Sequence, residues 1–265
     1  MPDIDNYAVY TDRMRRSMWD KVFFMDKIPG AELVVDYGCA DGSLIRFAHE
    51  LFPSMRFIGF DIDAEMIARA NSYNTENAVF CKSIADISAQ IARWNIPPER
   101  TVVNFSSVLH EVFHYGYDGR IITDMLAAIK PRYITVRDMM YFSHEGDTAP
   151  HELVKRVRSA LPQWQVADFE ARWGSIDSLK NLVHLMLKFR YVENWQRECA
   201  ENYFSYDQAQ MLSLLGPDGA YRPVLYNKYF LPWCRFDAEQ ALGMELGDDF
   251  TTHYALVLAR RSAEA

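Results

Sequence analysis

Cysteine is scarce in this sequence, and its arrangement excludes a disulfide scaffold. The 265 residues include four cysteines, which are scattered and form no Cys-x-x-Cys pair, so neither a small disulfide-bonded fold nor a cysteine-ligated zinc site is indicated. The chain also lacks a run of 18 apolar residues and a charged-then-apolar leader over residues 1–10. We therefore expect neither a membrane span nor a secretory signal, and we expect the protein in the reducing cytoplasm.

Basic residues are also fewer than acidic residues. The formal net charge is −8 and the pI is near 5.4. This balance weakens any model in which the whole surface binds a phosphate backbone, although it leaves room for local basic patches. With 49% hydrophobic residues, the chain is long enough to bury a full core.

What the sequence does contain is a glycine turn between an apolar strand and a helix, over residues 33–44. Gly38 and Gly42 allow the backbone to approach a ligand closely, because glycine has no Cβ and adopts positive φ. The turn also carries two carboxylates, Asp36 and Asp41. They would repel the pyrophosphate of a dinucleotide, so they favour a ligand with an ammonium or sulfonium charge.

The pattern Asp-x-Gly-x-x-Asp-Gly over residues 36–42 resembles the first motif of the class I S-adenosylmethionine-dependent methyltransferases. That family usually has a glycine where Ala40 stands. A second short strand ends in Asp61, 25 positions after Asp36, close to the offset at which an acid meets ribose hydroxyls in nucleotide-binding βαβ units. The resemblance implies S-adenosyl-L-methionine as the cofactor, with Ile62 packed on its adenine.

The resemblance also implies contacts after the third and fourth strands, residues 78–81 and 101–106. The family usually places an acid after the third strand to receive the adenine amino group. This sequence has Lys82-Ser83-Ile84 there, so Ser83 or Asp86 would take that role. The full predicted cofactor-binding set is Asp36, Gly38, Cys39, Ala40, Asp41, Asp61, Ile62, Ser83, Asn104 and Ser106.

The most distinctive chemistry follows the fourth strand. Residues 110–114 match HExxH, the zinc-protease signature, in which two histidines one helical turn apart hold the metal. A zinc site would need a third ligand from another element, whereas this motif lies in the fourth βα position, at the acceptor mouth of a methyltransferase-like fold. Acceptor-site residues, structural histidines and a metal site stay open as interpretations, and we favour the first, with no metal.

On that interpretation His110, Glu111 and His114 are the predicted catalytic residues. His110 or His114 would take the proton from the methyl-accepting atom, because an imidazole titrates near neutral pH. Glu111 would orient that histidine or hold a polar acceptor. Most of the acceleration would come from aligning the reacting atoms in line.

The order of elements predicts an α/β fold with a doubly wound parallel sheet. Strand and helix patterns alternate five times up to a strand over residues 133–138. A last strand over residues 252–260 would insert beside the fifth, as in the family, and complete a seven-stranded, mostly parallel sheet. Arg137 and Asp138 would emerge at the ligand-bearing edge, either paired with each other or the scaffold, or in contact with substrate.

Helical patterns precede and interrupt this sheet. A leading helix is predicted over residues 7–28, and helices over residues 151–161, 176–191 and 207–215 predict an inserted cap over the acceptor site. The predicted parts are an N-terminal helical segment over the cofactor (1–30), an S-adenosylmethionine-binding α/β core (31–142), the helical cap (143–220) and C-terminal strands that complete the sheet (221–265).

The predicted reaction is methyl transfer to an oxygen or nitrogen of a small-molecule acceptor. The sequence has no Asn-Pro-Pro-Tyr, Asp-Pro-Pro-Tyr or Pro-Cys motif after the fourth strand, which argues against two kinds of base methylation. An RNA or DNA methyltransferase on the same cofactor is the first alternative, and a zinc-binding HExxH protein is the second. Four basic residues of the cap are either a solvated face or a site for an anionic acceptor: Lys180, Lys188, Arg190 and Arg197.

Overall fold

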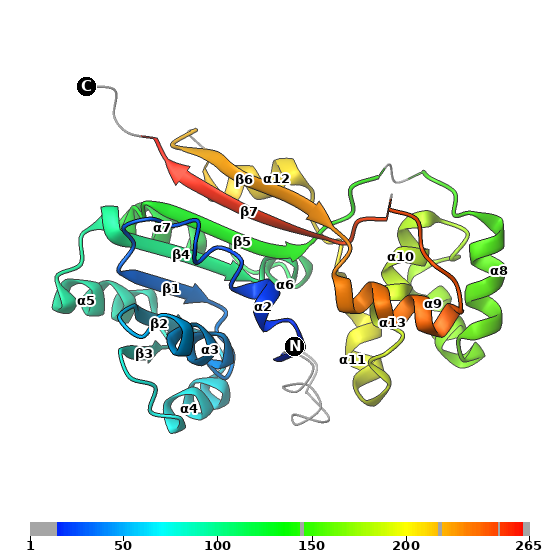
Figure 1. Ribbon diagram of the computed structural model, residues 1–265, viewed down its shortest axis with the longest axis horizontal. Coiled ribbons are helices and arrows are strands. Elements are labelled where there is room, and N and C mark those ends of the chain that lie inside the picture. Colours follow the sequence, from blue (N-terminus) through cyan, green and yellow to red (C-terminus); the bar gives the residue numbers. More distant parts are fainter. Residues whose placement is uncertain (1–14, 144–145, 217–218, 249, 262–265) are drawn as a thin grey trace. The chain divides into compact units, whose positions relative to one another are not determined.

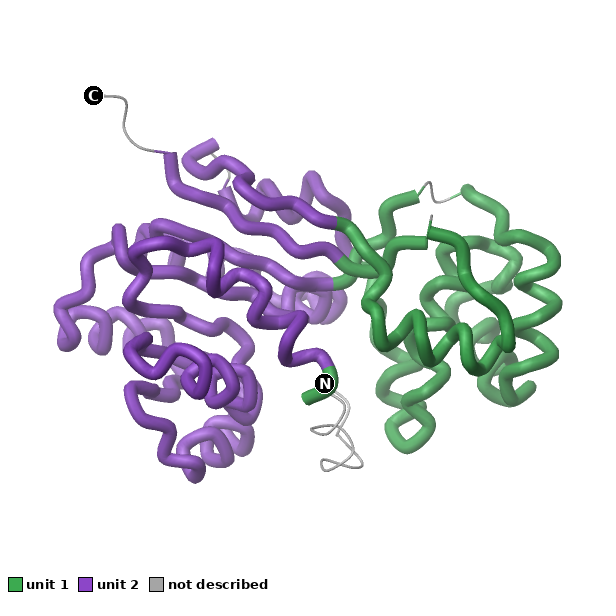
Figure 2. Tube along the Cα trace, viewed as in Figure 1, with its two compact units in different colours: residues 1–16, 139–205, 228–253 green, residues 17–138, 206–227, 254–265 purple. Residues whose placement is uncertain are grey.

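A computed structural model describes residues 15–143, 146–216, 219–248 and 250–261 (Figure 1). The chain divides into two compact units (Figure 2). Unit 2 holds the sheet and consists of residues 17–138, 206–227 and 254–265; unit 1 is mainly helical and consists of residues 1–16, 139–205 and 228–253.

Seven strands form one sheet in the order β3-β2-β1-β4-β5-β7-β6 (Figure 1). The neighbouring pairs from β3 to β5 are all parallel. Strand β7 runs antiparallel to β5. Two hydrogen bonds show this direction: Met140 N–H bonds the Thr252 carbonyl at one end, and Arg260 N–H bonds the Arg132 carbonyl at the other. This confirms the predicted doubly wound sheet, with the last strand beside the fifth. The strands are β1 Leu33–Tyr37, β2 Arg56–Phe60, β3 Ala78–Cys81, β4 Thr101–Ser106, β5 Tyr133–Met139, β6 Tyr221–Tyr229 and β7 His253–Arg260.

The central strands of unit 2 are covered on both faces. Strands β1, β4 and β5 are buried along their whole length, as their near-continuous apolar sequences predict for a parallel sheet between helical layers. Helix α3 packs with α2, whereas α7 packs with α5 and α12. The helical elements of this unit are α2 Met18–Lys21, α3 Ser43–Leu51, α4 Ala64–Ser72, α5 Ile84–Trp94, η1 Pro98–Arg100, α6 Leu109–His114, α7 Arg120–Ile129 and α12 Gln208–Leu215.

Unit 1 has a hydrophobic core of its own. Val157, Phe169 and Leu185, from three different helices, are all 0% exposed. Among the described helices, none is long and apolar enough to cross a membrane. The helical elements of this unit are α8 His151–Ala160, α9 Gln163–Trp173, α10 Leu179–Lys188, η2 Val192–Asn194, α11 Trp195–Ala200 and α13 Pro232–Leu242.

Unit 1 and the predicted cap do not have the same boundaries. Helix α12 lies inside the predicted cap but belongs to unit 2, where it packs on α7. Helix α13 lies beyond the predicted cap and belongs to unit 1, where it packs on α8 and α10. The assignment of a cap to the acceptor site stays a prediction.

The predicted leading helix over residues 7–28 is wrong in its second half. Helix α2 ends at Lys21, and residues 22–26 form turns in which Met25 N–H bonds the carbonyl three residues earlier. The buried side chains explain this, because Phe24 and Met25 are both buried although they do not lie on one helical stripe. The first half of the predicted helix lies outside the described residues.

The interpretation of the basic cap residues as a solvated face is wrong for Lys188 and Arg197. Lys188 is 0% exposed, and its Nζ donates to the carbonyls of Glu198, at 2.6 Å, and Glu201. Arg197 is 4% exposed and lies 3.6 Å from a Glu198 carboxylate oxygen. Arg190 is largely covered by the Trp233 ring, 3.9 Å from its centroid. Burial lowers the pKa of Lys188, and the partners of Lys188 and Arg197 lie within unit 1.

Candidate active site

The predicted glycine turn joins β1 to α3 at the carboxyl edge of the sheet. Gly38 has φ +78°, and its N–H bonds the Phe60 carbonyl at 2.8 Å, which ties the turn to β2. A Cβ on Gly38 would lie 2.5 Å from Val108 Cγ2, so this position requires glycine. Ala40 also has positive φ, +47°, and its N–H donates to Asp61 Oδ2 at 2.8 Å. The glycine that is usual in the family at Ala40 would therefore fit this conformation without strain.

A row of hydrogen-bonded side chains crosses the three central strands. Asp36, Asn104 and Thr135 are in register on β1, β4 and β5, and each is at most 2% exposed. Thr135 Oγ1 donates to Asn104 Oδ1, and Asn104 Nδ2 donates to Asp36 Oδ1, both at 2.8 Å. Burial raises the pKa of Asp36 to about 7, against the lowering effects of the Asn104 bond and the Lys21 charge. A cation beside Asp36 would favour its ionised form.

Lys21 of α2 is a candidate site residue that the sequence reasoning missed. It is 8% exposed, and within the described part of the chain its ammonium has no hydrogen-bond or ion-pair partner. Burial and the charge of Arg137 lower its pKa to about 8, whereas Asp36 is the first of the carboxylates that raise it. The sequence contained one indication that Lys21 is buried. It directly precedes Val22, which lies on the apolar stripe of the predicted helix.

Asp61 lies directly after β2, and both of its carboxylate oxygens are engaged by backbone. Oδ2 accepts the Ala40 N–H and Oδ1 accepts the Asp63 N–H at 2.9 Å. Burial raises the pKa of Asp61. Each oxygen keeps a second lone pair for a hydroxyl donor. The next side chain, Ile62, is 58% exposed, so an apolar surface is open beside this carboxylate.

Other members of the predicted cofactor-binding set have local partners. Asp41 Oδ1 accepts the N–H and the hydroxyl of Ser43, at 3.1 and 2.5 Å. Ser83 caps α5, accepting the Asp86 N–H at 3.1 Å and donating to Asp86 Oδ2 at 2.6 Å. Cys39 is 4% exposed, and burial raises the pKa of its thiol. Cofactor contacts by these three side chains stay predictions.

Ser106 differs from these residues because its hydroxyl makes no hydrogen bond to the described residues. It ends β4, is 8% exposed, and its buried Oγ has no hydrogen-bond partner in the described part of the protein. A buried hydroxyl without a partner costs free energy. The position therefore favours a role for Ser106 in binding a ligand.

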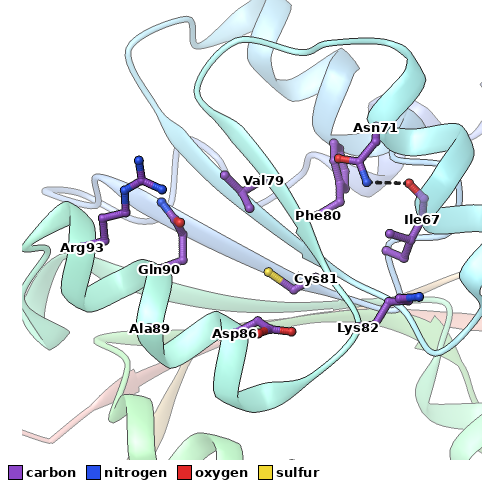
Figure 3. Close-up of a pocket in the computed structure, with 10 residues that line it drawn as sticks. All are labelled: Ile67, Asn71, Val79, Phe80, Cys81, Lys82, Asp86, Ala89, Gln90 and Arg93. Carbon is purple, nitrogen blue, oxygen red and sulfur yellow. Dashed lines mark hydrogen bonds between the residues drawn. The ribbon is translucent and has the colours of Figure 1, made fainter.

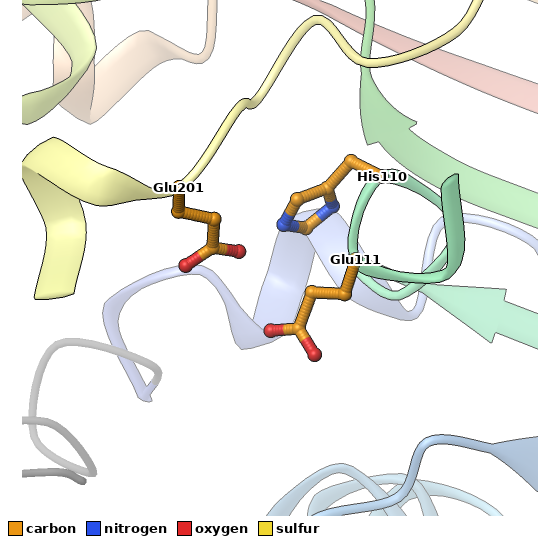
Figure 4. A group of neighbouring side chains, drawn as sticks. All are labelled: His110, Glu111 and Glu201. Atoms are coloured by element: carbon orange, nitrogen blue, oxygen red, sulfur yellow. The ribbon is translucent and has the colours of Figure 1, made fainter. Parts of the chain in front are cut away.

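The three predicted catalytic residues lie on α6, and Figure 4 draws His110 and Glu111 on this helix together with Glu201, which belongs to unit 1. His110 is 3% exposed, and its backbone N–H donates to Asp138 Oδ2 at 3.1 Å. Its ring Nδ1 lies 2.7 Å from Asp138 Oδ1. Asp138 is 0% exposed, so β5 supplies a buried carboxylate that holds both the backbone and the ring of His110.

The HExxH residues are helical, as a zinc site would require. However, no group of three candidate ligands among the described residues contains His114. The His114 ring instead meets the Tyr115 ring edge-on, with centroids 4.5 Å apart. Among the described residues, His110 and Asp138 are brought together, and the group of candidate metal ligands around His110 consists of Glu111 and Glu201 and does not include His114.

Arg137 and Asp138 bind different side chains. Pairing with each other was one of the alternatives that the sequence left open. Asp138 binds His110, whereas Arg137 Nε binds the Asp20 carboxylate and Arg137 Nη1 donates to Ser107 Oγ at 2.7 Å. The Arg137 contacts fasten α2 and the end of β4 to β5. The partnership of Asp138 with His110 was beyond the sequence pattern, because the two residues are separated by the whole of α7.

A cavity of about 560 Å³ lies beside the edge strand β3, between α4 and α5 (Figure 3). None of the predicted cofactor-binding or catalytic residues lines it. Asp86, the alternative partner for the adenine amino group, does line it. The lining residues are Ile67, Asn71, Val79, Phe80, Cys81, Lys82, Asp86, Ala89, Gln90 and Arg93.

Residues 34–132 match a family model described as a methyltransferase domain. No curated protein matches the chain. Similar solved structures include the plantazolicin methyltransferase BpumL in complex with a triazolic desmethylPZN analog and SAH, at 13% identity and a TM-score of 0.49, covering 94% of this chain and 85% of that chain.

Two further similar structures have lower TM-scores. A SAM-dependent methyltransferase from Aquifex aeolicus is 10% identical, with a TM-score of 0.46, covering 97% of this chain and 100% of that chain. The mitomycin 7-O-methyltransferase MmcR is 14% identical, with a TM-score of 0.47, covering 93% of this chain and 54% of that chain.

Proposed function

We propose that the chain is a class I, S-adenosylmethionine-dependent methyltransferase, and that it methylates an oxygen or nitrogen atom of a small-molecule acceptor. The observation that carries this proposal is the bond between His110 Nδ1 on α6 and the buried Asp138 carboxylate on β5; α6 follows β4, the strand next to β1 and its glycine turn. An imidazole held in this way is suited to take a proton from a hydroxyl or amino group. The acidic net charge of −8 supports a small molecule over a polyanion.

The residues at the carboxyl edge fit the charges of the cofactor. S-adenosylmethionine supplies an electrophilic methyl group on a sulfonium, together with an ammonium, a carboxylate and a ribose diol. Asp36 would bind the ammonium and Lys21 the carboxylate, because the two are oppositely charged groups at the same edge. Asp61 would accept the ribose hydroxyls, and the Ser106 hydroxyl would gain the partner it lacks.

His110 would act as the general base. Because its Nδ1 is held by Asp138, the ring accepts a proton at Nε2 as the acceptor atom bonds the methyl carbon. Glu111, next along α6, would hold a polar group of the acceptor. Alignment of acceptor and methyl group would supply most of the acceleration, so loss of the base would leave measurable turnover.

The proposal also includes a cytoplasmic location. None of the four cysteines is in a disulfide and all four are buried, which is what a reducing compartment favours. A chain of this composition would meet its acceptor among intracellular metabolites.

Labelled cofactor tests the proposal directly. Purified protein would be incubated with methyl-labelled S-adenosylmethionine and cell extract, and the label measured in small metabolites, RNA and protein. We expect label in the small-molecule fraction. His110→Ala should slow the transfer by about 100-fold or more, with cofactor affinity unchanged by calorimetry.

The matched control is His151→Ala, which removes a largely exposed imidazole on α8 and should change neither rate nor binding. Label found only in RNA or protein would contradict the small-molecule acceptor. No cofactor binding at millimolar concentration would contradict the activity itself.

A further inference from the structure

Four side chains of unit 2 form one buried hydrogen-bonded chain that ends on the proposed base. His110 binds Asp138, Tyr206 donates its hydroxyl to Asp138, and the Tyr206 and Tyr254 oxygens are 2.6 Å apart. The four residues come from α6, β5, the segment before α12, and β7. All four are at most 5% exposed. Their meeting point is Asp138, which has no direct part in the proposed proton transfer.

The hydrogen-bonding chemistry of the carboxylate determines which group donates in each of these hydrogen bonds. A carboxylate only accepts, so His110 Nδ1 and the Tyr206 hydroxyl must both donate to Asp138. The Tyr206 oxygen is then the acceptor for Tyr254. Burial raises the pKa of both tyrosines well above the ordinary value, so both hydroxyls keep their protons.

From this geometry we infer that Asp138 is a positioning residue, which fixes His110 in the tautomer with the proton on Nδ1, and that Tyr206 and Tyr254 set the basicity of the ring. The inference rests on the proposed function and deepens it. The neutral imidazole then presents its lone pair at Nε2, where a general base needs it. With the proton on Nε2 instead, the ring would have no lone pair there to take a proton.

The same bonds place the ring in space. Asp138 Oδ2 accepts the His110 backbone N–H at 3.1 Å, and Oδ1 faces Nδ1 at 2.7 Å, so one carboxylate fixes both ends of the residue. The Tyr206 ring is stacked on Phe113, with centroids 4.8 Å apart. Phe113 also lies on α6, so packing and hydrogen bonding hold this helix against the same two partners.

Tyr206 affects the basicity of His110 through the shared carboxylate. Each donor to Asp138 withdraws charge from it, and a less charged carboxylate stabilises an imidazolium less. The other charged groups near His110 are Arg137, which is engaged with Asp20, Glu111 on α6 itself, and Glu201, which is grouped with His110 and Glu111. None of them changes between the variants.

The tautomer can be measured without cofactor or acceptor. The full-length protein would be labelled with ¹⁵N-histidine and the His110 ring assigned by loss of its signals in His110→Gln. In the neutral ring we expect the proton on Nδ1. A neutral ring with its proton on Nε2 would overturn the inference.

Asp138→Asn is the sharpest variant, because it keeps the shape of the side chain and its acceptor for the His110 N–H. The amide then presents N–H₂ to the ring, so Nδ1 must accept and the proton moves to Nε2. We expect that change in the spectrum and a fall in kcat of about 100-fold. The deficit should shrink for acceptors that are already ionised, which a purely structural role would not produce. A spectrum still showing Nδ1–H would overturn the inference.

Tyr206→Phe keeps the ring on Phe113 and removes one donor to Asp138. The NMR titration midpoint of His110 should rise by about half a pH unit or more, and Tyr254→Phe should shift it less in the same direction. Tyr221→Phe is the matched control, because its hydroxyl bonds the Pro131 carbonyl at 2.9 Å. A midpoint that falls or stays in Tyr206→Phe would overturn the tuning role.

These measurements separate the inference from the proposed function. If His110→Ala keeps full methyl transfer while the wild-type ring carries Nδ1–H, the proposed base is wrong and the tautomer assignment stands. If His110→Ala is slow but the ring carries Nε2–H, the base stands and the positioning role is wrong. Wild-type protein decides both points, so the outcome does not depend on Asp138→Asn folding.

Discussion

Ala40 is the residue at which this chain departs from the glycine that is usual in the family, and its backbone shows the consequence. Its φ of +47° is in the left-handed region, which disfavours any residue with a Cβ by about 1 kcal/mol or more. We expect Ala40→Gly to raise the unfolding free energy by about 0.5–1 kcal/mol, since the strain relieved exceeds the added chain entropy. Thermal unfolding should then shift upward by about 2 °C.

The matched control applies the same chemical change in a helix. Ala89 is exposed in α5, and Ala89→Gly should lower the unfolding free energy by about 1 kcal/mol. Opposite signs for the two variants are the expected result. A destabilised Ala40→Gly would show that the Ala40 methyl group makes contacts that outweigh the backbone strain.

Single residues also show where a sequence pattern stops being informative. Gly38 and Asp61 could be predicted because a glycine in a tight turn and an acid at a strand end have few alternative roles. Asp41 and Ser83 could not be resolved, because short polar side chains at a helix start cap helices as readily as they bind ligands. Asp138 stayed open for a different reason, since its partner His110 is distant in sequence and only the folded sheet brings them together.

At the scale of elements, the charges of Lys21 on α2 and Asp36 on β1 determine how cofactor binding should depend on pH. Asp36 must be ionised to bind an ammonium, and its pKa is raised from 3.8 to about 7, so affinity should rise with pH up to about 7. Lys21 must be charged to bind a carboxylate, and its pKa is lowered from 10.5 to about 8, so affinity should fall above about 8. Calorimetry over pH 5.5–9.5, a range of about four units that spans both values, should show a maximum between them.

Two variants assign the two limbs of that profile. Asp36→Asn should remove the acid limb. Lys21→Met should make the alkaline limb shallower, and the part that remains should come from the cofactor's own amino group, which titrates in every variant. An unchanged alkaline limb in Lys21→Met would exclude Lys21 from the site.

The raised pKa of Asp36 also affects stability, because the folded protein binds the Asp36 proton more tightly than the unfolded chain does. Its contribution to stability is therefore lost as pH rises from about 4 to about 7.

The sequence predicted best those elements whose pattern of buried and exposed residues is simple. Strands β1, β3 and β4 lie where the sequence placed them, because short apolar runs bounded by turns have few alternatives. Helix α9 was not predicted, since its buried positions Val166 and Phe169 alternate with polar residues and an exposed Trp164. Residues 22–28 do not form a helix although Val22, Met25 and Ile28 lie at helical spacing, because Phe24, outside that spacing, is buried as well.

At the scale of the whole molecule, the division into two units could not be predicted from composition. Unit boundaries fall at residues 138/139, 227/228 and 253/254, inside β5, β6 and β7. Pro- and Gly-rich linkers, the usual signs of a boundary, are therefore missing at those three positions. Long-range contacts define the units, and a single sequence contains no direct record of such contacts.

The charge of the whole molecule gives the last prediction, that the protein does not bind nucleic acid. There are 36 acidic residues against 28 Lys and Arg, and of the four basic residues that favoured RNA or DNA, Lys188 and Arg197 are buried. We expect no saturable binding of single-stranded RNA or duplex DNA by fluorescence anisotropy at 50–200 mM salt, since the acidic excess of the molecule repels a polyanion. Binding that weakens steeply across this salt range would contradict the prediction, because that dependence is the signature of phosphate contacts. It would also move the acceptor from a metabolite to a polynucleotide, and the His110 base would then have to act on a nucleotide.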